Sequence, residues 1–334
     1  MSNYVPPFTI TNTILDRASS IMKKIGKLDN YKDLNKMPVL RRNNRIKSIH
    51  SSLAIEANSL SFDQVKDVID GKIVIGPKKE IQEVKNAYNA YVKIKEVNPY
   101  SLSDLKKLHR ILTYLTVKDA GNFRKCNEGV FDSEGNCIHV CPPPEQVDDL
   151  MKCLFNWMKS NHNTIHPLIL SSIFHYEFVF IHPFEDGNGR TARLWQNVIL
   201  SNWEGLFEYV PIETQIKKYQ EDYYKVIENC NKIGESTEFI EFMLYMIDDS
   251  LDGLIENINL EINHISSYVK KLLDVMEPNI NYTTTELMKL LNMKSRISFR
   301  KNYLIPAIDN GVVKMAFPNT PTSKNQTYYK DTSF

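Results

Sequence analysis

The segment from Leu168 to Phe180 constrains the fold of this 334-residue chain more than any other part of the sequence. It is apolar nearly all round a helix, although it carries the polar side chains of His175 and Glu177. A membrane-spanning helix needs about 20 consecutive apolar residues, so this segment is too short and too polar to cross a bilayer. We therefore expect residues 167–181 to form the central helix of a domain, buried on all sides by other helices.

The sequence on both sides of this segment repeats the pattern of amphipathic helices. Apolar residues recur at three- and four-residue steps, and charged residues occupy the opposite face. This pattern covers residues 12–28, 39–56, 79–95, 102–112, 145–160 and 213–275. The chain is 42% hydrophobic and 24% charged, which is typical of a globular protein and excludes general disorder. We expect a mainly α protein of about two domains.

One stretch, residues 121–143, has a different character because it is rich in glycine and ends in three prolines. Two short β-prone segments, at 129–131 and 137–140, flank a turn at 132–135. This order predicts a β-hairpin inside the otherwise helical chain.

Two cysteines near this hairpin, Cys137 and Cys141, have His139 between them, which raises the alternative of a zinc site. Structural zinc sites normally show a second pair of ligands at matching spacing, and the five cysteines of the sequence do not provide one. We therefore expect free thiols.

The last part of the chain differs from the rest in pattern and in charge. It reads as helix, turn, helix and a two-stranded wing. Residues 279–334 carry eight basic and three acidic residues, a net charge of +5 in a chain of net charge +1. We predict four regions: an N-terminal helical region (1–78), a core (79–250), a connecting helix (251–278) and a winged-helix-like module (279–334).

The module has two alternative roles. Arg296, Arg300 and Lys301 lie on its expected recognition helix, a pattern that is usual for DNA binding. The alternative is a contact with another protein or with a second copy of the chain. We favour the protein contact, although the sequence contains no feature that decides between the two.

The densest group of reactive side chains directly follows the expected central helix. It is the segment HPFEDGNGRTAR at 182–193. Gly187 and Gly189 allow the backbone to turn its amides towards a ligand at the start of the next helix, where the helix dipole favours an anion. Arg190 and Arg193 are three residues apart on that helix, so both can face one polyphosphate.

Two further residues of this segment suit nucleotide chemistry. Asp186 is a hard oxygen ligand of the kind that holds Mg²⁺ together with phosphate oxygens. His182 is a titratable base beside it. The combination predicts a site for Mg²⁺-bound nucleotide phosphates, with a histidine that takes a proton from an acceptor. The alternative is a glycine-rich turn between two core helices with a capping histidine.

The same segment matches the pattern HxFx(D/E)GNGRxxR at every specified position, and in this the chain resembles the Fic family. The resemblance implies the Fic fold, an α-helical bundle over about residues 80–250 with a β-hairpin flap. It also implies transfer of a nucleotide monophosphate, usually AMP from ATP, to a Ser, Thr or Tyr hydroxyl of a protein. The death-on-curing kinases carry Lys where this chain has Gly189, which favours nucleotidyl transfer over phosphorylation.

The resemblance implies a role for each residue of the motif. His182 would deprotonate the target hydroxyl, and Asp186 would hold Mg²⁺ across the α- and β-phosphates of ATP. Asn188 and the neighbouring backbone amides would cradle the phosphates. Arg190 and Arg193 would bind the β- and γ-phosphates that leave as pyrophosphate.

The hairpin at 126–143 would be the flap of the family, which pairs with an extended segment of the target protein. Its second strand would face the nucleotide, and a later helix would close over the nucleoside. The residues expected at these two places are Asn136, Cys137, Ile138, His139, Tyr223, Tyr224 and Asn231.

A second motif lies upstream, in the segment Ser52–Asn58. It resembles the inhibitory motif (S/T)xxxE(G/N) of Fic proteins, which begins here at Ser52. Glu56 beside Arg193 would form an ion pair and occupy the arginine that should bind the γ-phosphate. Position 57 departs from the pattern, because Ala57 stands where Gly or Asn is usual. We expect this difference to shift the end of the helix and to weaken the clamp.

The sequence thus predicts an autoinhibited protein adenylyltransferase with ATP as co-substrate, Mg²⁺ as cofactor and a protein target. Two alternatives remain open: a hydrolase that removes AMP from proteins, with Glu56 aligning a water, and a DNA-binding regulator with a nucleotide-sensing Fic core. A homodimer is also left open. The N-terminal sequence MSNYVPPFTI lacks a basic segment followed by an apolar one, so we expect a cytoplasmic protein that does not contact a membrane.

Overall fold

The computed structural model describes residues 4–30, 38–131, 137–264, 267–309, 311–318, 320–321 and 323–330. These residues are mainly helical and carry two small antiparallel sheets, so the expected mainly α class is confirmed. The chain divides into two compact units, residues 1–25 with 44–251 and residues 26–43 with 252–334. Within the described ranges, no helix combines the length and the apolar character that a membrane crossing requires.

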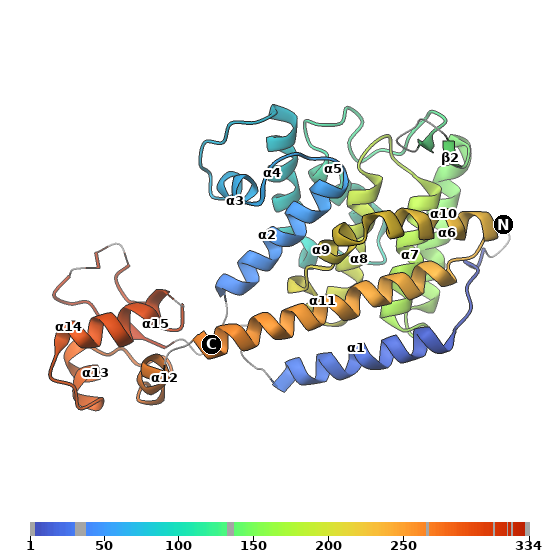
Figure 1. Ribbon diagram of the computed structural model, residues 1–334. Helices are drawn as coiled ribbons and strands as arrows, with labels where there is room; N and C mark the ends of the chain where they lie inside the picture. Colours follow the sequence, from blue (N-terminus) through green and yellow to red (C-terminus); the bar gives the residue numbers. More distant parts are fainter. Residues whose placement is uncertain are drawn as a thin grey trace. The chain divides into compact units, whose positions relative to one another are not determined.

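Helix α7 (Pro167–Ile181) lies at the centre of the first unit (Figure 1). Pro167 occupies its first turn, where the missing N–H of proline would have no partner in the helix. The helix packs against α6 (Pro144–Asn161) and α8 (Asn188–Trp203). Every residue from Leu168 to Phe178 is buried, so the prediction of a central buried helix is confirmed.

The remaining helices up to residue 264 are α1 (Asn12–Asn30), α2 (Pro38–Ile55), α3 (Phe62–Ile69), α4 (Lys78–Val92), α5 (Leu102–Leu112), α9 (Ile212–Lys218), α10 (Gln220–Ile233) and α11 (Thr237–His264). Short 3₁₀-helices follow α4 at Ile94–Glu96 and α8 at Gly205–Tyr209. The single helical run predicted for 213–275 is therefore divided. Gly234 ends α10 in a left-handed conformation (φ 80°), which glycine adopts without a steric penalty.

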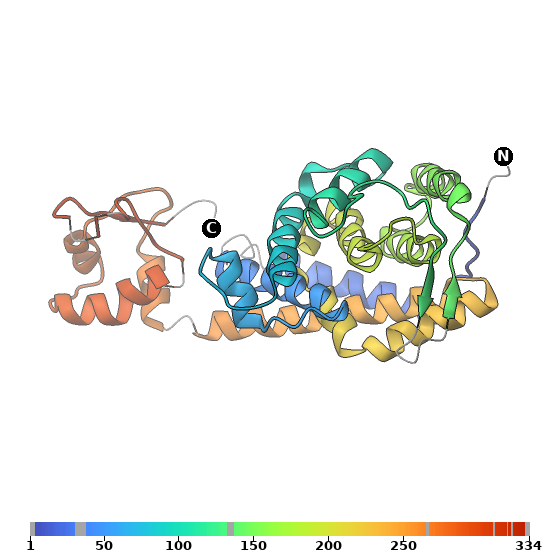
Figure 2. The ribbon, with the colours of Figure 1, turned by 90° about the horizontal axis from the view of Figure 1, so that it is seen from above.

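The predicted hairpin is confirmed. Strands β1 (Gly129–Phe131) and β2 (Cys137–Val140) are antiparallel, with Gly129 opposite Val140. The turn between them, residues 132–136, lies outside the described residues. Strand β2 lies beside α10, which brings the hairpin to the same part of the first unit as the end of α7 (Figure 2).

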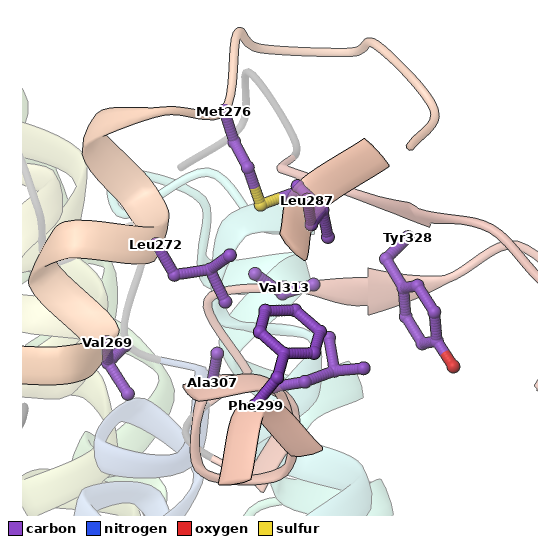
Figure 3. Close-up of a cluster of buried hydrophobic side chains, with 9 residues drawn as sticks. Val269, Leu272, Met276, Leu287, Phe299, Ala307, Val313 and Tyr328 are labelled. Atoms are coloured by element: carbon purple, nitrogen blue, oxygen red, sulfur yellow. The ribbon is translucent and has the colours of Figure 1, made fainter. Parts of the chain in front are cut away.

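The second unit ends in a small module with a hydrophobic core of its own (Figure 3). Its elements are α12 (Ser267–Asp274), α13 (Thr284–Leu290), α14 (Arg296–Phe299), a π-helical turn (Arg300–Leu304), α15 (Ile305–Asp309), β3 (Lys314–Met315) and β4 (Tyr328–Tyr329). Strands β3 and β4 are antiparallel. This is the predicted order of helix, turn, helix and two-stranded hairpin.

The core of this module includes α12, which the sequence analysis placed in a connecting helix over 251–278. Two residues of α12, Val269 and Leu272, are fully buried in one cluster with residues from α13, α14 and β4. The other members of this cluster are Met276, Leu287, Phe299, Leu304, Ala307, Val313 and Tyr328. Residues 251–278 are thus divided between α11 and α12, and α12 packs as part of the module.

The module depends on few buried side chains, so truncation of one of them should have a large effect. We expect Phe299→Ala to destabilise the module by about 3–5 kcal/mol, because it removes an aromatic ring that is 0% exposed. The control is Ile297→Ala on the same helix, where the side chain is 82% exposed and the change should stay within about 0.5 kcal/mol. Hydrogen exchange of residues 267–330 measures both, and equal effects of the two substitutions would contradict this account of the core.

Candidate active site

The residues of the sequence motif form the turn between α7 and α8. His182 ends α7 in a left-handed conformation (φ 50°), and its N–H donates to the carbonyl of Phe178. Gly187 precedes α8 with φ 84°, and a Cβ atom at this position would lie 2.8 Å from the methyl group of Thr113. Glycine is therefore required at position 187 both by the backbone conformation and by the space available.

The side chain of Asn188 holds this turn together. Its Oδ1 accepts from the N–H of Phe184 at 2.9 Å, and its Nδ2 donates to the carbonyl of the same residue at 2.7 Å. The phosphate cradle predicted for Asn188 can therefore use its backbone amide in the first turn of α8, while its side chain is occupied inside the loop.

His109 is a positioning residue that no motif of the sequence indicates. Its Nδ1 accepts from the N–H of Gly121 at 2.9 Å, so the hydrogen is on Nε2, which donates to the carbonyl of Asp186 at 3.0 Å. Its ring stacks on Phe184 with the centroids 3.6 Å apart. Burial lowers the pKa of His109 to about 4, so the ring is neutral at physiological pH.

Arg124 is a second residue that the sequence analysis missed. It is buried, and its Nε donates to the carbonyl of His182 at 2.7 Å. Its other nitrogens donate to the carbonyls of Cys126 at 2.8 Å and Pro142 at 2.5 Å, on the two sides of the hairpin. Arg124 thus joins the end of α7 to the hairpin. An isolated arginine in a loop carries no sequence signal for this role.

A cleft opens beside His182. It brings together residues from the end of α2, the hairpin, α7, α8 and α10. The predicted site residues in its lining are Glu56, His139, His182, Gly189, Arg193, Tyr223, Tyr224 and Asn231. Cys137 and Ile138 lie on β2, but their side chains are outside the described part of the structure, and Asn136 lies outside the described residues altogether.

The cleft residues from the hairpin and α10 are themselves anchored. His139 contacts the carbonyl of Phe180 through Nε2 at 2.8 Å. Asn231 accepts from the Tyr176 hydroxyl at 3.0 Å. The Tyr224 hydroxyl points to the carbonyl of Ile55 at 3.5 Å, which connects the lining of the cleft with the end of α2.

His182 combines exposure to this cleft with a largely buried ring. Burial lowers its pKa, while the nearby carbonyl of Val179 acts in the opposite direction and the charge of Arg124 lowers it further. The imidazole is therefore neutral at physiological pH, which is the form that can accept a proton.

The two arginines of the motif have different partners. Arg190, with a side chain that is 4% exposed, pairs with Glu83 of α4 at 3.2 Å and with Asp186 at 3.0 Å. It is not part of the cleft lining, whereas Arg193 is. The spacing of the two arginines predicts that both face one polyphosphate; in this structure Glu83 on α4 and Asp186 hold Arg190 away from the cleft lining.

Asp186 lies at the exposed side of the turn. Its Oδ1 accepts from the N–H of Gly187 and from Arg190, and its Oδ2 is 3.9 Å from the ammonium group of Lys79. Within the described ranges, no three His, Cys, Asp or Glu side chains are grouped so that they could hold a metal ion. A cation at Asp186 would therefore need phosphate oxygens and water as its other ligands.

The predicted ion pair between Glu56 and Arg193 is present. Arg193 Nη2 is 2.7 Å from Glu56 Oε1 and 3.0 Å from the carbonyl of Ser52, and its Nε donates to the Ser52 hydroxyl at 3.1 Å. Burial acts to lower the pKa of Arg193, but Glu56 and the neighbouring tyrosines keep it above the ordinary value. Gly189 leaves the space for this pair, because a Cβ atom there would collide with the Glu56 carboxylate.

The last turn of α2 is held by side chains from α9 and α10. Lys217 donates to the carbonyl of Ala54 at 3.0 Å, and Gln220 donates to the carbonyl of Ile55 at 3.1 Å. Ala57 adopts a left-handed conformation (φ 63°), which is the conformation that Gly or Asn adopts more easily. The helix ends at Ile55 and the ion pair forms with alanine at this position, at the expense of backbone strain.

Two family models match the chain. The Fic/DOC family model matches residues 99–200, and the model of the Filamentation induced by cAMP protein Fic-like, C-terminal domain, matches residues 267–329. The crystal structure of a Fic family protein from Desulfovibrio desulfuricans G20 is 38% identical, with a TM-score of 0.74 over 98% of this chain and 99% of that one. The chain belongs to the Fic family.

Several curated relatives carry the name Protein adenylyltransferase Fic. The one from Nematostella vectensis is 31% identical over 215 residues, which are 61% of this Fic chain and 47% of the relative. The one from Drosophila melanogaster is 27% identical over 248 residues, which are 70% of this chain and 48% of the relative. The chain thus spans about half the length of these relatives.

The strain at Ala57 gives a test of the inhibitory helix end. We expect Ala57→Gly to stabilise the Fic chain by about 0.5–1 kcal/mol, because glycine removes the left-handed penalty but gains freedom in the unfolded chain. Ala54→Gly, inside α2, is the matched control and should destabilise by about 0.5–1 kcal/mol. Urea unfolding compares the two variants with the wild type, and a loss of stability in both would contradict the strain at position 57.

Proposed function

We propose that this Fic chain is a protein adenylyltransferase that Glu56 holds in an inhibited state. The observation that carries the proposal is the ion pair between Glu56 and Arg193, which lies in the same cleft as His182. The shared name of the relatives supports AMP transfer, and the complete motif at 182–193 supports the same chemistry in this chain.

His182 acts as the general base. Its neutral imidazole accepts the proton of a target hydroxyl, and the hydroxyl oxygen attacks the α-phosphorus of ATP. The bond between the α-phosphorus and the bridging oxygen breaks, and pyrophosphate leaves. Arg193 and the backbone amides at the start of α8 bind the leaving phosphates, which carry the negative charge that develops.

Glu56 inhibits by occupying Arg193. A carboxylate 2.7 Å from the guanidinium neutralises its charge and repels a phosphate that approaches the same group. ATP then binds weakly, or with its α-phosphorus out of line with the hydroxyl. Withdrawal of Glu56 frees Arg193 for the last phosphate.

Asp186 is the residue that would hold Mg²⁺. Its Oδ2 has the distant Lys79 ammonium as its partner among the described residues, and the side chain is 42% exposed, so the oxygen is accessible to a cation. Mg²⁺ usually takes one or two protein carboxylates together with phosphate oxygens and water, which fits a single carboxylate at this site. The ion would neutralise charge on the phosphates of ATP.

The target protein would bind at the hairpin. Strand β2 follows the edge of the cleft, and Val140 at its end is 77% exposed. An extended segment that pairs with this hairpin through its main chain would bring its hydroxyl to His182. Such main-chain pairing depends little on the side chains of the target. It therefore fits targets that share an extended segment with a hydroxyl group.

Labelled ATP with Mg²⁺ tests the proposal directly. Glu56→Gly should raise AMP labelling by about 10²-fold over the wild type, because one charged donor becomes available to the phosphates. Glu56→Gln keeps the side-chain volume without the charge and should give an intermediate rate. His182→Ala in the Glu56→Gly background should abolish labelling. Equal labelling of all these proteins would contradict both role assignments.

The pH dependence of the Glu56→Gly protein tests His182 as the base. Its pKa lies below the ordinary value of about 6.5, so the neutral form persists as the pH falls and is lost only when the pH passes the lowered pKa. We expect the acidic limb of the kcat/KM profile, which reports the free enzyme, to lie below about pH 6.5. A rate that is already halved above that pH would contradict a buried neutral His182.

Removal of AMP from proteins is a second candidate, because Glu56 faces the same cleft as His182 and is in a place to hold an attacking water. Incubation of AMP-labelled protein with the wild type and with Glu56→Gly distinguishes the two directions. Release of AMP by the wild type that is lost in Glu56→Gly favours the hydrolase.

DNA binding by the C-terminal module receives less support. Arg296, Arg300 and Lys301 are exposed, as a DNA contact requires, but Ile297 between them is 82% exposed as well. A large apolar side chain in the middle of the basic group suits a protein contact better than a phosphate backbone. A contact with another protein, or with a second copy of the chain, is therefore the role that we propose for the module.

A further inference from the structure

Three buried polar side chains form a hydrogen-bonded row. His175 Nδ1 is 2.6 Å from Gln196 Oε1, and His175 Nε2 is 2.9 Å from the Tyr223 hydroxyl. Tyr223 lines the same cleft as Arg193, and the positive charge of the guanidinium acts to lower the pKa of Tyr223, against the larger effect of burial. His175, Gln196 and Tyr223 are each at most 2% exposed.

The amide oxygen of Gln196 fixes the direction of every hydrogen bond in this row. An amide oxygen only accepts, so His175 Nδ1 carries the hydrogen and donates to Gln196 Oε1. In the neutral ring Nε2 then carries no hydrogen and accepts from the Tyr223 hydroxyl. The lone pairs of the Tyr223 oxygen are thereby left for a donor, and arginine only donates.

The protonation states agree with this direction. Burial lowers the pKa of His175 to about 3, so the ring stays neutral, with one donor and one acceptor. Burial raises the pKa of Tyr223 above its ordinary value, so the hydroxyl keeps its hydrogen. A neutral histidine of this single tautomer is what the row requires.

The row differs from Glu56 because it does not have to leave before a phosphate binds to Arg193. Glu56 holds the guanidinium in the inhibited state and must leave before a phosphate can bind there. His175, Tyr223 and Gln196 lie on α7, α10 and α8, so the departure of the last turn of α2 leaves them in place.

We propose that His175 is a positioning residue for nucleotide binding: it fixes the Tyr223 hydroxyl as an acceptor for Arg193 and so holds the guanidinium where it meets the last phosphate. This inference rests on the proposed function. His175 does not touch the cleft, and its effect passes through Tyr223. When His175 is replaced by a residue without an acceptor, the Tyr223 hydrogen turns towards Arg193 and repels it, and the arginine loses its fixed position.

The test is equilibrium binding of ATP and of ADP to the Glu56→Gly protein and to variants in that background. His175→Phe keeps an aromatic ring in the core but removes both hydrogen bonds. We expect it to weaken ATP binding about tenfold, the effect of about 1.4 kcal/mol, and to leave ADP binding nearly unchanged because ADP lacks the last phosphate. His175→Gln returns an acceptor near the Nε2 position and should restore part of the preference for ATP.

Two further variants separate positioning from packing. Tyr223→Phe should reduce the ATP preference as His175→Phe does, and the double variant should lose little more, because both act on one path to Arg193. Phe174→Leu, on the same helix and equally buried, should lower thermal stability but keep the ratio of ATP to ADP affinity.

Equal weakening of ATP and ADP in His175→Phe would show that the histidine only packs the core, and additive effects of His175 and Tyr223 would show that they act independently. Either result would overturn the inference. A Glu56→Gly parent that binds ATP no better than ADP would instead overturn the proposed role of Arg193, and the role of His175 with it.

Discussion

The site is organised around one buried positive charge. Arg193 is 2% exposed, and a charge so far from water must be compensated by polar partners. The partners are Ser52 on α2 and Glu56 directly after it, while α8 carries the arginine itself. In this structure the compensating anion is Glu56, and in the active state that we propose it is the last phosphate of ATP. On this proposal the two anions satisfy the same electrostatic requirement and therefore exclude each other.

The second requirement is a backbone turn that places His182 at the cleft. The chain leaves α7 in a left-handed conformation and enters α8 through Gly187. Distant side chains then hold the turn through its carbonyl groups: Arg124 binds that of His182, and His109 binds that of Asp186. His182 is therefore held by main-chain contacts, and burial lowers the pKa of its ring, which keeps the imidazole neutral.

Much of this arrangement was open to prediction. The apolar run at 168–180 identified the central helix, and the fixed spacing of 182–193 identified the turn, because both depend on local sequence. Glu56 was found because its motif is also local. The roles of Arg124, His109 and His175 depend on contacts with residues 12 to 77 positions away, and single residues leave no pattern for such contacts. The different partners of Arg190 and Arg193 depend likewise on Glu83, which lies on a helix far away in the sequence.

The release of Glu56 that we propose concerns the end of α2 as well as the ion pair. The carbonyls of Ala54 and Ile55 are held by Lys217 and Gln220, so a movement of this last turn has to break both hydrogen bonds. Ala57 favours the movement of this turn. Its left-handed backbone carries a conformational strain of about 1 kcal/mol, which is relieved when the turn opens. A strain of this size makes the population of the open state about fivefold higher with alanine at position 57 than with glycine. A partner that binds the open end of α2 shifts the balance further only by its difference in affinity for the two states. Since the strain already lowers the cost of opening, such a partner needs a smaller affinity difference to activate this chain than it would need with glycine at position 57.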